Sequence, residues 1–254
     1  MGLHPFLDHP TTLAFAHRGG ASDHPENTLP AFASAVAMGY RYLETDVHLT
    51  ADGTLVAFHD DRLDRVTDGC GAIADLPWAE VRQARVDGRE PIPTLDDLFE
   101  AFPGARLNID PKHDRAVDPL AHAVRRHRAT DRVCVASFSD DRLRRLRAAL
   151  GGLCTALGPR QVARLRLGGP LGMARDFAGQ AAQVPPTVGG VPLVTARFVA
   201  RAHGAGLQVH VWTIDDPVEM HRLLDLDVDG LMTDRPAVLK QVLEDRGRWS
   251  DAGG

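Results

Sequence analysis

The sequence predicts an α/β fold, specifically a (β/α)8 TIM barrel with a small insertion after its second strand. Short apolar runs alternate along the chain with longer helical stretches, which is the pattern of repeated strand–helix units. The length of 254 residues suits one barrel of this kind. A single domain over residues 1–254 is therefore expected, with the insertion at about residues 47–92.

Eight strands are expected in order, each followed by a helix. The strand ranges are 13–17, 41–47, 106–111, 132–137, 153–157, 181–185, 207–213 and 229–233. The helix ranges are 27–38, 94–102, 116–128, 139–149, 160–167, 195–205, 216–225 and 236–245. Ser139-Asp140-Asp141 can cap the fourth helix and Asp215-Asp216-Pro217 can open the seventh. Serine and aspartate side chains accept hydrogen bonds from the free N–H groups of a first turn, and proline has no N–H to satisfy there.

The second strand departs from the repeat. Asp52-Gly53 lies between two runs of alternating hydrophobicity, which predicts a hairpin. The returning strand brings His59 back near the point where Glu44 and Asp46 leave the barrel. Residues 61–92 then show no clear hydrophobic periodicity of a helix or strand. An insertion of this length at a strand–helix junction is usually a functional cap.

The first strand ends in the motif Ala16-His17-Arg18-Gly19-Gly20. A buried parallel strand delivers polar side chains to the mouth of a barrel at this position. His17 offers an acid–base group near neutral pH, and Arg18 offers a forked cation that suits phosphate. The two glycines allow a sharp turn and a close approach to a ligand.

Carboxylates end the second and third strands. Glu44 and Asp46 are two residues apart on a strand, so both point to one face. Close carboxylates repel unless a proton or cation lies between them, and Mg²⁺ or Ca²⁺ prefers such oxygen ligands. Asp110 is a candidate third ligand, and Lys112 a candidate partner for phosphate charge. The alternative for Glu44 and Asp46 is that both are solvated acids beside the hairpin. The alternative for Asp110 and Lys112 is a surface ion pair that contributes little.

Two histidines and one tryptophan complete the candidate site. His17 and His59 come from different segments but converge on one mouth, where one can remove a proton and the other can protonate a leaving group. Trp212 ends the seventh strand and can pack against the carbon face of a substrate; ordinary core packing is the alternative.

The composition argues against nucleic acid and a membrane as partners. The chain has 29 basic and 34 acidic residues and a net charge of −5, so no global basic field attracts nucleic acid. Three widely spaced cysteines form no metal or disulfide pattern, which favours reduced thiols and a cytoplasmic location. No signal peptide is visible and no apolar run approaches the length of a bilayer span, so no stable membrane insertion is expected.

Six motifs, taken together and in this order, resemble the glycerophosphodiester phosphodiesterase family. They cover residues 16 to 236: Ala-His-Arg-Gly-Gly at 16–20, Pro-Glu-Asn-Thr at 25–28, Glu-Thr-Asp-Val at 44–47, Phe-His-Asp at 58–60, Val-Trp-Thr at 211–213 and Thr-Asp-Arg-Pro at 233–236. The resemblance implies a TIM barrel that uses a divalent cation to hydrolyse a small-molecule glycerophosphodiester to glycerol 3-phosphate and an alcohol.

The resemblance also implies roles for single residues. Glu44 and Asp46 become metal ligands, His17 and His59 the acid–base pair, Arg18 and Lys112 phosphate contacts, and Trp212 a wall for the glycerol. The third strand departs from the family pattern, because Asp110-Pro111-Lys112 stands where the family usually has Glu-x-Lys.

Two other functions stay open at this point. An Asp-x-Lys on the third strand also fits the related lysophospholipase D and sphingomyelinase D barrels, although the sequence gives no clear sign of the apolar, lipid-facing surface that they usually need. A non-catalytic phosphodiester-binding barrel is the alternative outside enzymology. It is expected to have lost one of His17, Glu44, Asp46 or His59, and all four are present.

Overall fold

The computed structural model describes residues 3–168 and 177–250, and within them eight parallel strands form a barrel. Neighbours pair in the order β8-β7-β6-β2-β1-β13-β12-β9, and a backbone bridge between Ala156 and Ala181 closes the ring. The strands are β1 (Leu13–Ala16), β2 (Tyr42–Leu49), β6 (Arg106–Pro111), β7 (Val133–Val135), β8 (Cys154–Thr155), β9 (Ala181–Val184), β12 (Gln208–Val211) and β13 (Gly230–Thr233).

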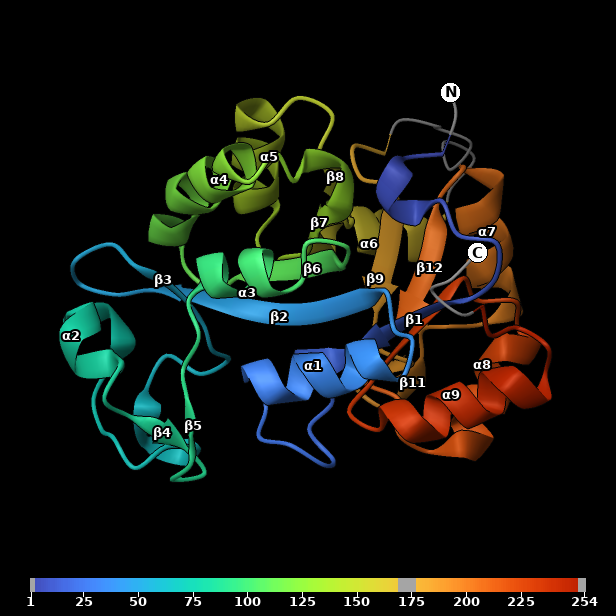
Figure 1. Cartoon of the computed structure of the whole chain (residues 1–254). Helices are drawn as coiled ribbons and strands as arrows, with labels where there is room; N and C mark the ends of the chain where they lie inside the picture. Colours follow the sequence, from blue (N-terminus) through green and yellow to red (C-terminus); the bar gives the residue numbers. More distant parts are fainter. Residues whose placement is uncertain (1–2, 169–176, 251–254) are drawn as a thin grey trace.

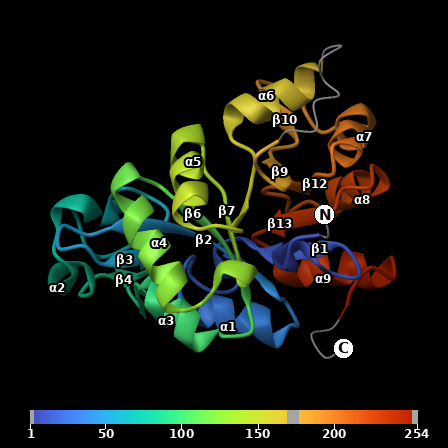
Figure 2. The same ribbon diagram turned by 90° about the horizontal axis from the view of Figure 1, so that it is seen from above.

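Helices cover the outside of this barrel, as Figures 1 and 2 show from two directions. The predicted fold class is confirmed, with a helix after each strand and an insertion after the second. Ser139 and Asp216 cap α5 and α8 as expected, each accepting a hydrogen bond from a first-turn N–H. The helices are α1 (Leu29–Ala37), α3 (Leu95–Ala101), α4 (Val117–Arg126), α5 (Asp140–Ala149), α6 (Pro159–Leu167), α7 (Ala196–Gly204), α8 (Pro217–Asp225) and α9 (Pro236–Asp245).

Side chains point alternately to the two faces of each strand, so the protein has one apolar core between the barrel and its helices and another inside the barrel. Leu43 and Val47 of β2 face outward and pack under the helices. Tyr42 of the same strand faces the barrel interior with Phe15 of β1, and their ring centroids are 4.9 Å apart. Glu44 shares the inward face of β2, because it lies two residues after Tyr42. The inward faces of the strands therefore supply both the inner core and the candidate site.

The N-terminal end of the barrel is closed by a 3₁₀ turn, Pro5–Leu7. Phe6 is fully buried and packs edge-on against Tyr42, with ring centroids 5.3 Å apart. The Tyr42 hydroxyl donates a hydrogen bond of 2.9 Å to the Phe6 carbonyl. With this end filled, the open mouth of the barrel is the end at which the strands finish.

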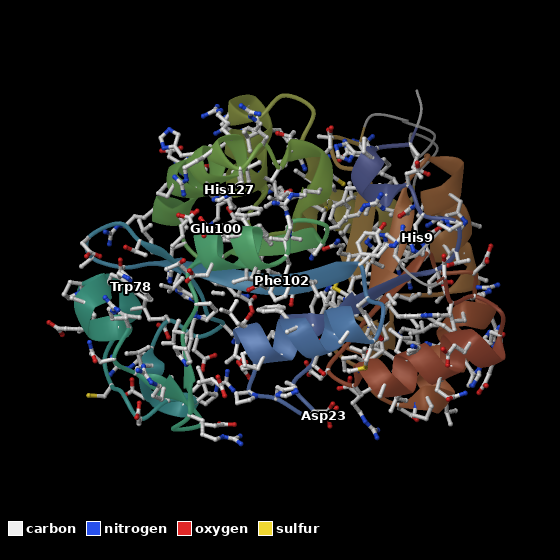
Figure 3. All side chains as sticks on the ribbon, in the orientation of Figure 1. His9, Asp23, Trp78, Glu100, Phe102 and His127 are labelled. Atoms are coloured by element: carbon white, nitrogen blue, oxygen red, sulfur yellow. The ribbon has the colours of Figure 1, made fainter. Side chains whose placement is uncertain are left out.

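The insertion begins where β2 outruns its neighbours and turns back as β3 (Leu55–Ala57), which pairs antiparallel with it. It continues through α2 (Trp78–Val81) and a small hairpin of β4 (Arg85–Val86) and β5 (Glu90–Pro91). Figure 3 places Trp78 on this insertion and His9 at the opposite end of the molecule. The insertion has its own apolar cluster, formed by Val56, Phe58, Leu63, Ile73, Val81, Ala84, Val86 and Ile92.

No helix within residues 3–168 and 177–250 combines the length and apolar character that crossing a membrane requires.

Candidate active site

A cavity of about 580 Å³ opens at the end of the barrel where the strands finish. It brings together every side chain that the sequence proposes for the site, although these come from segments nearly two hundred positions apart. The proposed residues that line it are His17, Arg18, Glu44, Asp46, His59, Asp110, Lys112 and Trp212.

The turn after β1 places His17 and Arg18 in this cavity. Arg18, Gly19 and Gly20 all have positive φ angles, of 50°, 85° and 90°. A Cβ atom at Gly19 would lie 2.9 Å from the Ala31 Cβ, and one at Gly20 would lie 2.3 Å from the Pro236 ring. Glycine is required at both positions because the chain passes so close to α1 and α9 while in the left-handed region.

His17 is held between two acidic side chains. Its Nδ1 donates a hydrogen bond of 2.7 Å to Oδ1 of Asp234, and its Nε2 lies 3.8 Å from Oε2 of Glu44. Burial alone lowers the pKa of His17, but Glu44 and Asp234 outweigh burial and leave the pKa above its ordinary value. Because the Nδ1 proton stays on the ring and is held in the hydrogen bond to Asp234, the neutral ring presents its Nε2 lone pair toward the cavity.

His59 has a matching arrangement on the insertion side. Its Nδ1 donates a 2.6 Å hydrogen bond to Oδ1 of Asp60, and its backbone carbonyl accepts a 2.9 Å hydrogen bond from Nε2 of His48. Arg65 hydrogen-bonds to Asp60 and is the main reason that the pKa of Asp60 falls to about 2. A charged carboxylate therefore orients the His59 ring, as Asp234 orients His17.

Glu26 connects the two halves of the mouth. It accepts a hydrogen bond of 3.0 Å from Nη1 of Arg18 and one of 2.7 Å from Nη2 of Arg65. Its neighbour Asn27 is buried and accepts a hydrogen bond of 2.8 Å from the Thr45 hydroxyl. The Pro-Glu-Asn-Thr segment thus holds the loop after β1 in place and reaches across to the insertion.

Three carboxylates lie on the floor of the cavity. Asp46 of β2 is paired in register with Asp110 of β6, so their side chains are neighbours on the inward face. Burial, and then the charge of Asp46, raise the pKa of Glu44 to about 7. Burial is also the main reason that the pKa of Asp110 lies above its ordinary value. Three buried carboxylates this close together need positive charge nearby if they are to be ionised at the same time.

Lys112 and Arg18 supply part of that charge. Nζ of Lys112 lies 2.6 Å from Oδ1 of Asp46 and 2.9 Å from Oδ2 of Asp110, so it bridges the two carboxylates. Nε of Arg18 lies 3.4 Å from Oδ2 of Asp46, but the two atoms are too poorly aligned for a hydrogen bond. The predicted phosphate contacts are thus paired with the predicted metal ligands.

The donor set fits a hard divalent cation in its chemistry. Oδ2 of Asp46 and Oδ1 of Asp110 are buried and have no hydrogen-bond partner among the described residues. Carboxylate oxygens are the ligands that Mg²⁺ and Ca²⁺ prefer. Within the described ranges no group of three or more His, Cys, Asp or Glu side chains is already arranged to hold a metal ion.

Several functional side chains were not assigned a role from the sequence. Asp234, the partner of His17, could have been inferred, because the last strand of a closed barrel pairs with the first. Asp215 was expected to help open the helix that follows the seventh strand. Instead it accepts hydrogen bonds of 2.8 Å from the Thr233 hydroxyl and from the backbone N–H of Asp234. No sequence signal pointed to Arg65.

Part of the cavity wall is apolar. Trp212 follows β12 and meets Phe138 edge-on, with ring centroids 5.9 Å apart. Both line the cavity, so Trp212 has an aromatic neighbour there that the sequence did not predict. The site therefore joins a charged floor to an apolar wall.

Comparisons with known proteins show which family this chain resembles over most of its length. Residues 17–238 match the model of the glycerophosphoryl diester phosphodiesterase family. The probable glycerophosphodiester phosphodiesterase 2 of Mycobacterium tuberculosis is 42% identical and covers 97% of this chain and 96% of that protein. The glycerophosphodiester phosphodiesterase of Caldanaerobacter subterraneus is 30% identical over 93% of this chain and 99% of that protein. A solved relative from Silicibacter pomeroyi superposes with a TM-score of 0.84 at 28% identity, over 98% of this chain and 100% of that chain.

Proposed function

Because the chain belongs to the glycerophosphoryl diester phosphodiesterase family and is an enzyme of that class, we propose that it hydrolyses glycerophosphodiesters to glycerol 3-phosphate and an alcohol with a two-histidine mechanism. The observation that carries the mechanism is the pairing of His17 with Asp234 and of His59 with Asp60 in one cavity. Two oriented imidazoles beside Arg18 and Lys112 suit a reaction that moves one proton from the nucleophile and another to the leaving group.

Arg18 and Lys112 bind the phosphodiester in this account. Both line the cavity, and each is held by carboxylates so that its position is fixed before the substrate arrives. The guanidinium of Arg18 can offer two parallel N–H donors to phosphate oxygens, whereas Lys112 contributes a compact charge. Together they stabilise the negative charge that builds on these oxygens as the bond to phosphorus breaks.

His17 is the proposed base and His59 the proposed acid. Asp234 fixes the proton of His17 on Nδ1, so Nε2 is the atom that accepts a proton from the attacking oxygen, which belongs to water or to the neighbouring glycerol hydroxyl. If the hydroxyl attacks, a cyclic phosphate forms as the alcohol leaves, and a water then opens this ring to give glycerol 3-phosphate. His59, oriented by Asp60, then gives a proton to the oxygen of the departing alcohol. Trp212 packs against the carbon face of the glycerol.

Glu44, Asp46 and Asp110 would hold a divalent cation, Mg²⁺ or Ca²⁺. The two buried carboxylate oxygens without hydrogen-bond partners support this proposal. When bound, the cation adds positive charge beside the phosphate and polarises its oxygens. Its charge would also offset the mutual repulsion of Glu44 and Asp46, which adds to the effect of burial on the pKa of Glu44.

A coupled assay for released glycerol 3-phosphate tests this function. A panel of glycerophosphodiesters is incubated with chelator-treated enzyme and with added Mg²⁺ or Ca²⁺. The proposal expects product release that depends on the added cation. Full activity in excess chelator would show that no cation is needed. If no glycerol 3-phosphate is released from any member of the panel, the proposed reaction is wrong.

A further inference from the structure

His48 lies where β2 extends past its neighbours and leads into the insertion. It follows Tyr42, Glu44 and Asp46 at alternating positions, so its side chain shares their face of the strand. Its backbone is paired in register with Val56 of β3, and the residue is only 2% exposed. Figure 1 shows β3 beside this end of β2, next to the insertion helix α2. His48 is therefore a fixed, buried group at the junction of the barrel and the insertion.

The ring of His48 holds the backbone of His59. Its Nε2 donates a hydrogen bond of 2.9 Å to the carbonyl oxygen of His59. One residue earlier, the backbone N–H of Phe58 donates a hydrogen bond of 3.0 Å to the carbonyl of Asp46. Within the described ranges, no other hydrogen bond reaches the backbone of His59. β2 thus fixes the returning chain at two consecutive residues, and the second contact depends on a single side chain.

The other contacts of His59 reach the barrel by a longer route. The His59 side chain is 35% exposed, and its ring hydrogen-bonds to Asp60. Asp60 pairs with Arg65, which in turn pairs with Glu26 in the loop after β1. This route passes through three further side chains, whereas His48 connects a barrel strand to His59 in one step. The place of His59 relative to the carboxylates of the cavity floor therefore depends on His48.

We propose that His48 is a positioning residue for the proton transfer to the leaving alcohol. By fixing the backbone of His59, it sets the His59 imidazole beside the oxygen that leaves phosphorus. As the P–O bond breaks, the proton of that imidazole passes to this oxygen and the alcohol departs neutral. His48 is not among the described residues that line the cavity, so it acts through His59 and does not touch the substrate. The inference rests on the proposed function, in which His59 is the acid.

The leaving group determines how much the reaction needs this proton. Choline leaves as a strongly basic alkoxide unless its oxygen is protonated, whereas p-nitrophenol leaves as a stable anion. A misplaced acid therefore slows the hydrolysis of glycerophosphocholine but not that of the p-nitrophenyl ester of glycerol 3-phosphate. A general loss of structure slows the hydrolysis of both esters.

The test compares kcat/KM for release of choline and of p-nitrophenol from these two esters. His48→Leu removes the donor and keeps a side chain of similar bulk. We expect it to lower kcat/KM for glycerophosphocholine at least about tenfold and to leave the p-nitrophenyl ester within about twofold of wild type. His48→Gln keeps an N–H donor of similar reach, so both esters should stay within about threefold of wild type.

His4→Leu is the matched control. The ring of His4 also hydrogen-bonds to a backbone carbonyl, that of Gly152 at 2.7 Å, but it does so beside the 3₁₀ turn at the closed end of the barrel. This variant is expected to keep the wild-type kcat/KM for both esters. If thermal unfolding shows that His48→Leu does not fold, His48→Asn takes its place, since its amide lies closer to the backbone than Nε2 and falls short of the His59 carbonyl.

A double variant tests whether His48 acts through His59. In a His59→Ala background, His48→Leu should change kcat/KM for glycerophosphocholine by less than about twofold, because the group that it positions is already gone. A further tenfold loss in this background would mean that His48 serves another purpose, and the inference would be wrong.

The inference and the proposed function fail in different ways. If His59→Ala slows glycerophosphocholine far more than the p-nitrophenyl ester, His59 is the acid and the proposed function stands. The inference is then overturned if His48→Leu slows both esters equally or slows neither, or if His48→Gln is as slow as His48→Leu. If His59→Ala slows both esters equally, or if wild type releases no alcohol from either, both proposals are wrong.

Discussion

Nη2 of Arg65 lies 2.7 Å from Oε1 of Glu26, and this ion pair joins the insertion to the loop that follows β1. Arg65 also pairs with Asp60. The two carboxylates in turn hold Arg18 and His59. One exposed arginine of the insertion therefore completes a chain of charged contacts between a proposed phosphate contact and a proposed catalytic histidine.

Removing Arg65 is expected to loosen both of these groups. Arg65→Met keeps most of the side-chain bulk but frees Asp60 and Glu26, and we expect kcat/KM to fall by about tenfold to hundredfold. Arg62→Met is the matched control, because Arg62 is exposed on the same segment and, among the described residues, forms an ion pair only with the exposed Asp64, at 3.2 Å. Equal activity of the two variants would show that the chain of contacts does not position the site.

Asp234 is expected to act on turnover through His17. In Asp234→Asn the amide can hold His17 in the opposite tautomer, so kcat should fall at least about tenfold while KM changes little. Asp229→Asn makes the same change at the other end of β13, where Asp229 accepts a 2.8 Å hydrogen bond from His203. Steady-state kinetics of both variants provide the test, and a normal kcat for Asp234→Asn would argue against His17 as the base.

Cation binding should be visible without any turnover. Thermal unfolding of chelator-treated protein is followed with and without Ca²⁺ or Mg²⁺, and a cation at about one hundred times its Kd should add about 2.7 kcal/mol to the free energy of unfolding. Asp46→Asn should lose this gain. Asp61→Asn removes the same charge at an exposed position nearby and should keep it. A gain that survives in Asp46→Asn would place the cation elsewhere.

The buried, neutral ring of His210 is expected to make the folded protein less stable in acid. Gln183 donates to its Nδ1 and its Nε2 donates to Gln208, so the buried ring is neutral, and burial lowers its pKa to about 3. In the unfolded chain the pKa returns to about 6.5, and the unfolded state binds the extra proton below that pH. Stability therefore falls as pH falls from about 6.5 toward 3, by about 2 kcal/mol at pH 5 from this residue.

Urea unfolding of wild type and His210→Gln at about pH 7.5 and pH 5 isolates this contribution. The variant should be less stable than wild type near neutral pH, yet lose about 2 kcal/mol less on acidification. An equal loss in the two proteins would mean that His210 is not the residue that responds to pH.

Most of the barrel could be predicted from the sequence, because each strand is a short apolar run whose end is marked by polar residues or glycine. The alternation of side chains along β2 placed Glu44 and Asp46 on one face of the strand. The predicted hairpin at Asp52-Gly53 brought the chain back, so that His59 lines the same cavity as these two carboxylates. These are local patterns, and the strand periodicity alone determines which face each side chain takes.

The parts that the sequence did not predict depend on contacts between distant segments. Asp234 reaches His17 because β13 pairs with β1, and Arg65 reaches Glu26 across the mouth. Phe138 was missed for the same reason, because it is far in sequence from Trp212, which it meets in the cavity.

The central claim is that His17 and His59 divide the proton transfers of one hydrolysis. The most direct test is the rate of glycerol 3-phosphate release from glycerophosphocholine by His17→Ala and His59→Ala, with His203→Ala as the control at a histidine outside the cavity. The account predicts that each of the first two loses at least about a hundredfold in kcat, since each removes one proton-transfer group, and that the control keeps the wild-type rate. If either His17→Ala or His59→Ala retains most of the wild-type rate, the two-histidine mechanism is wrong.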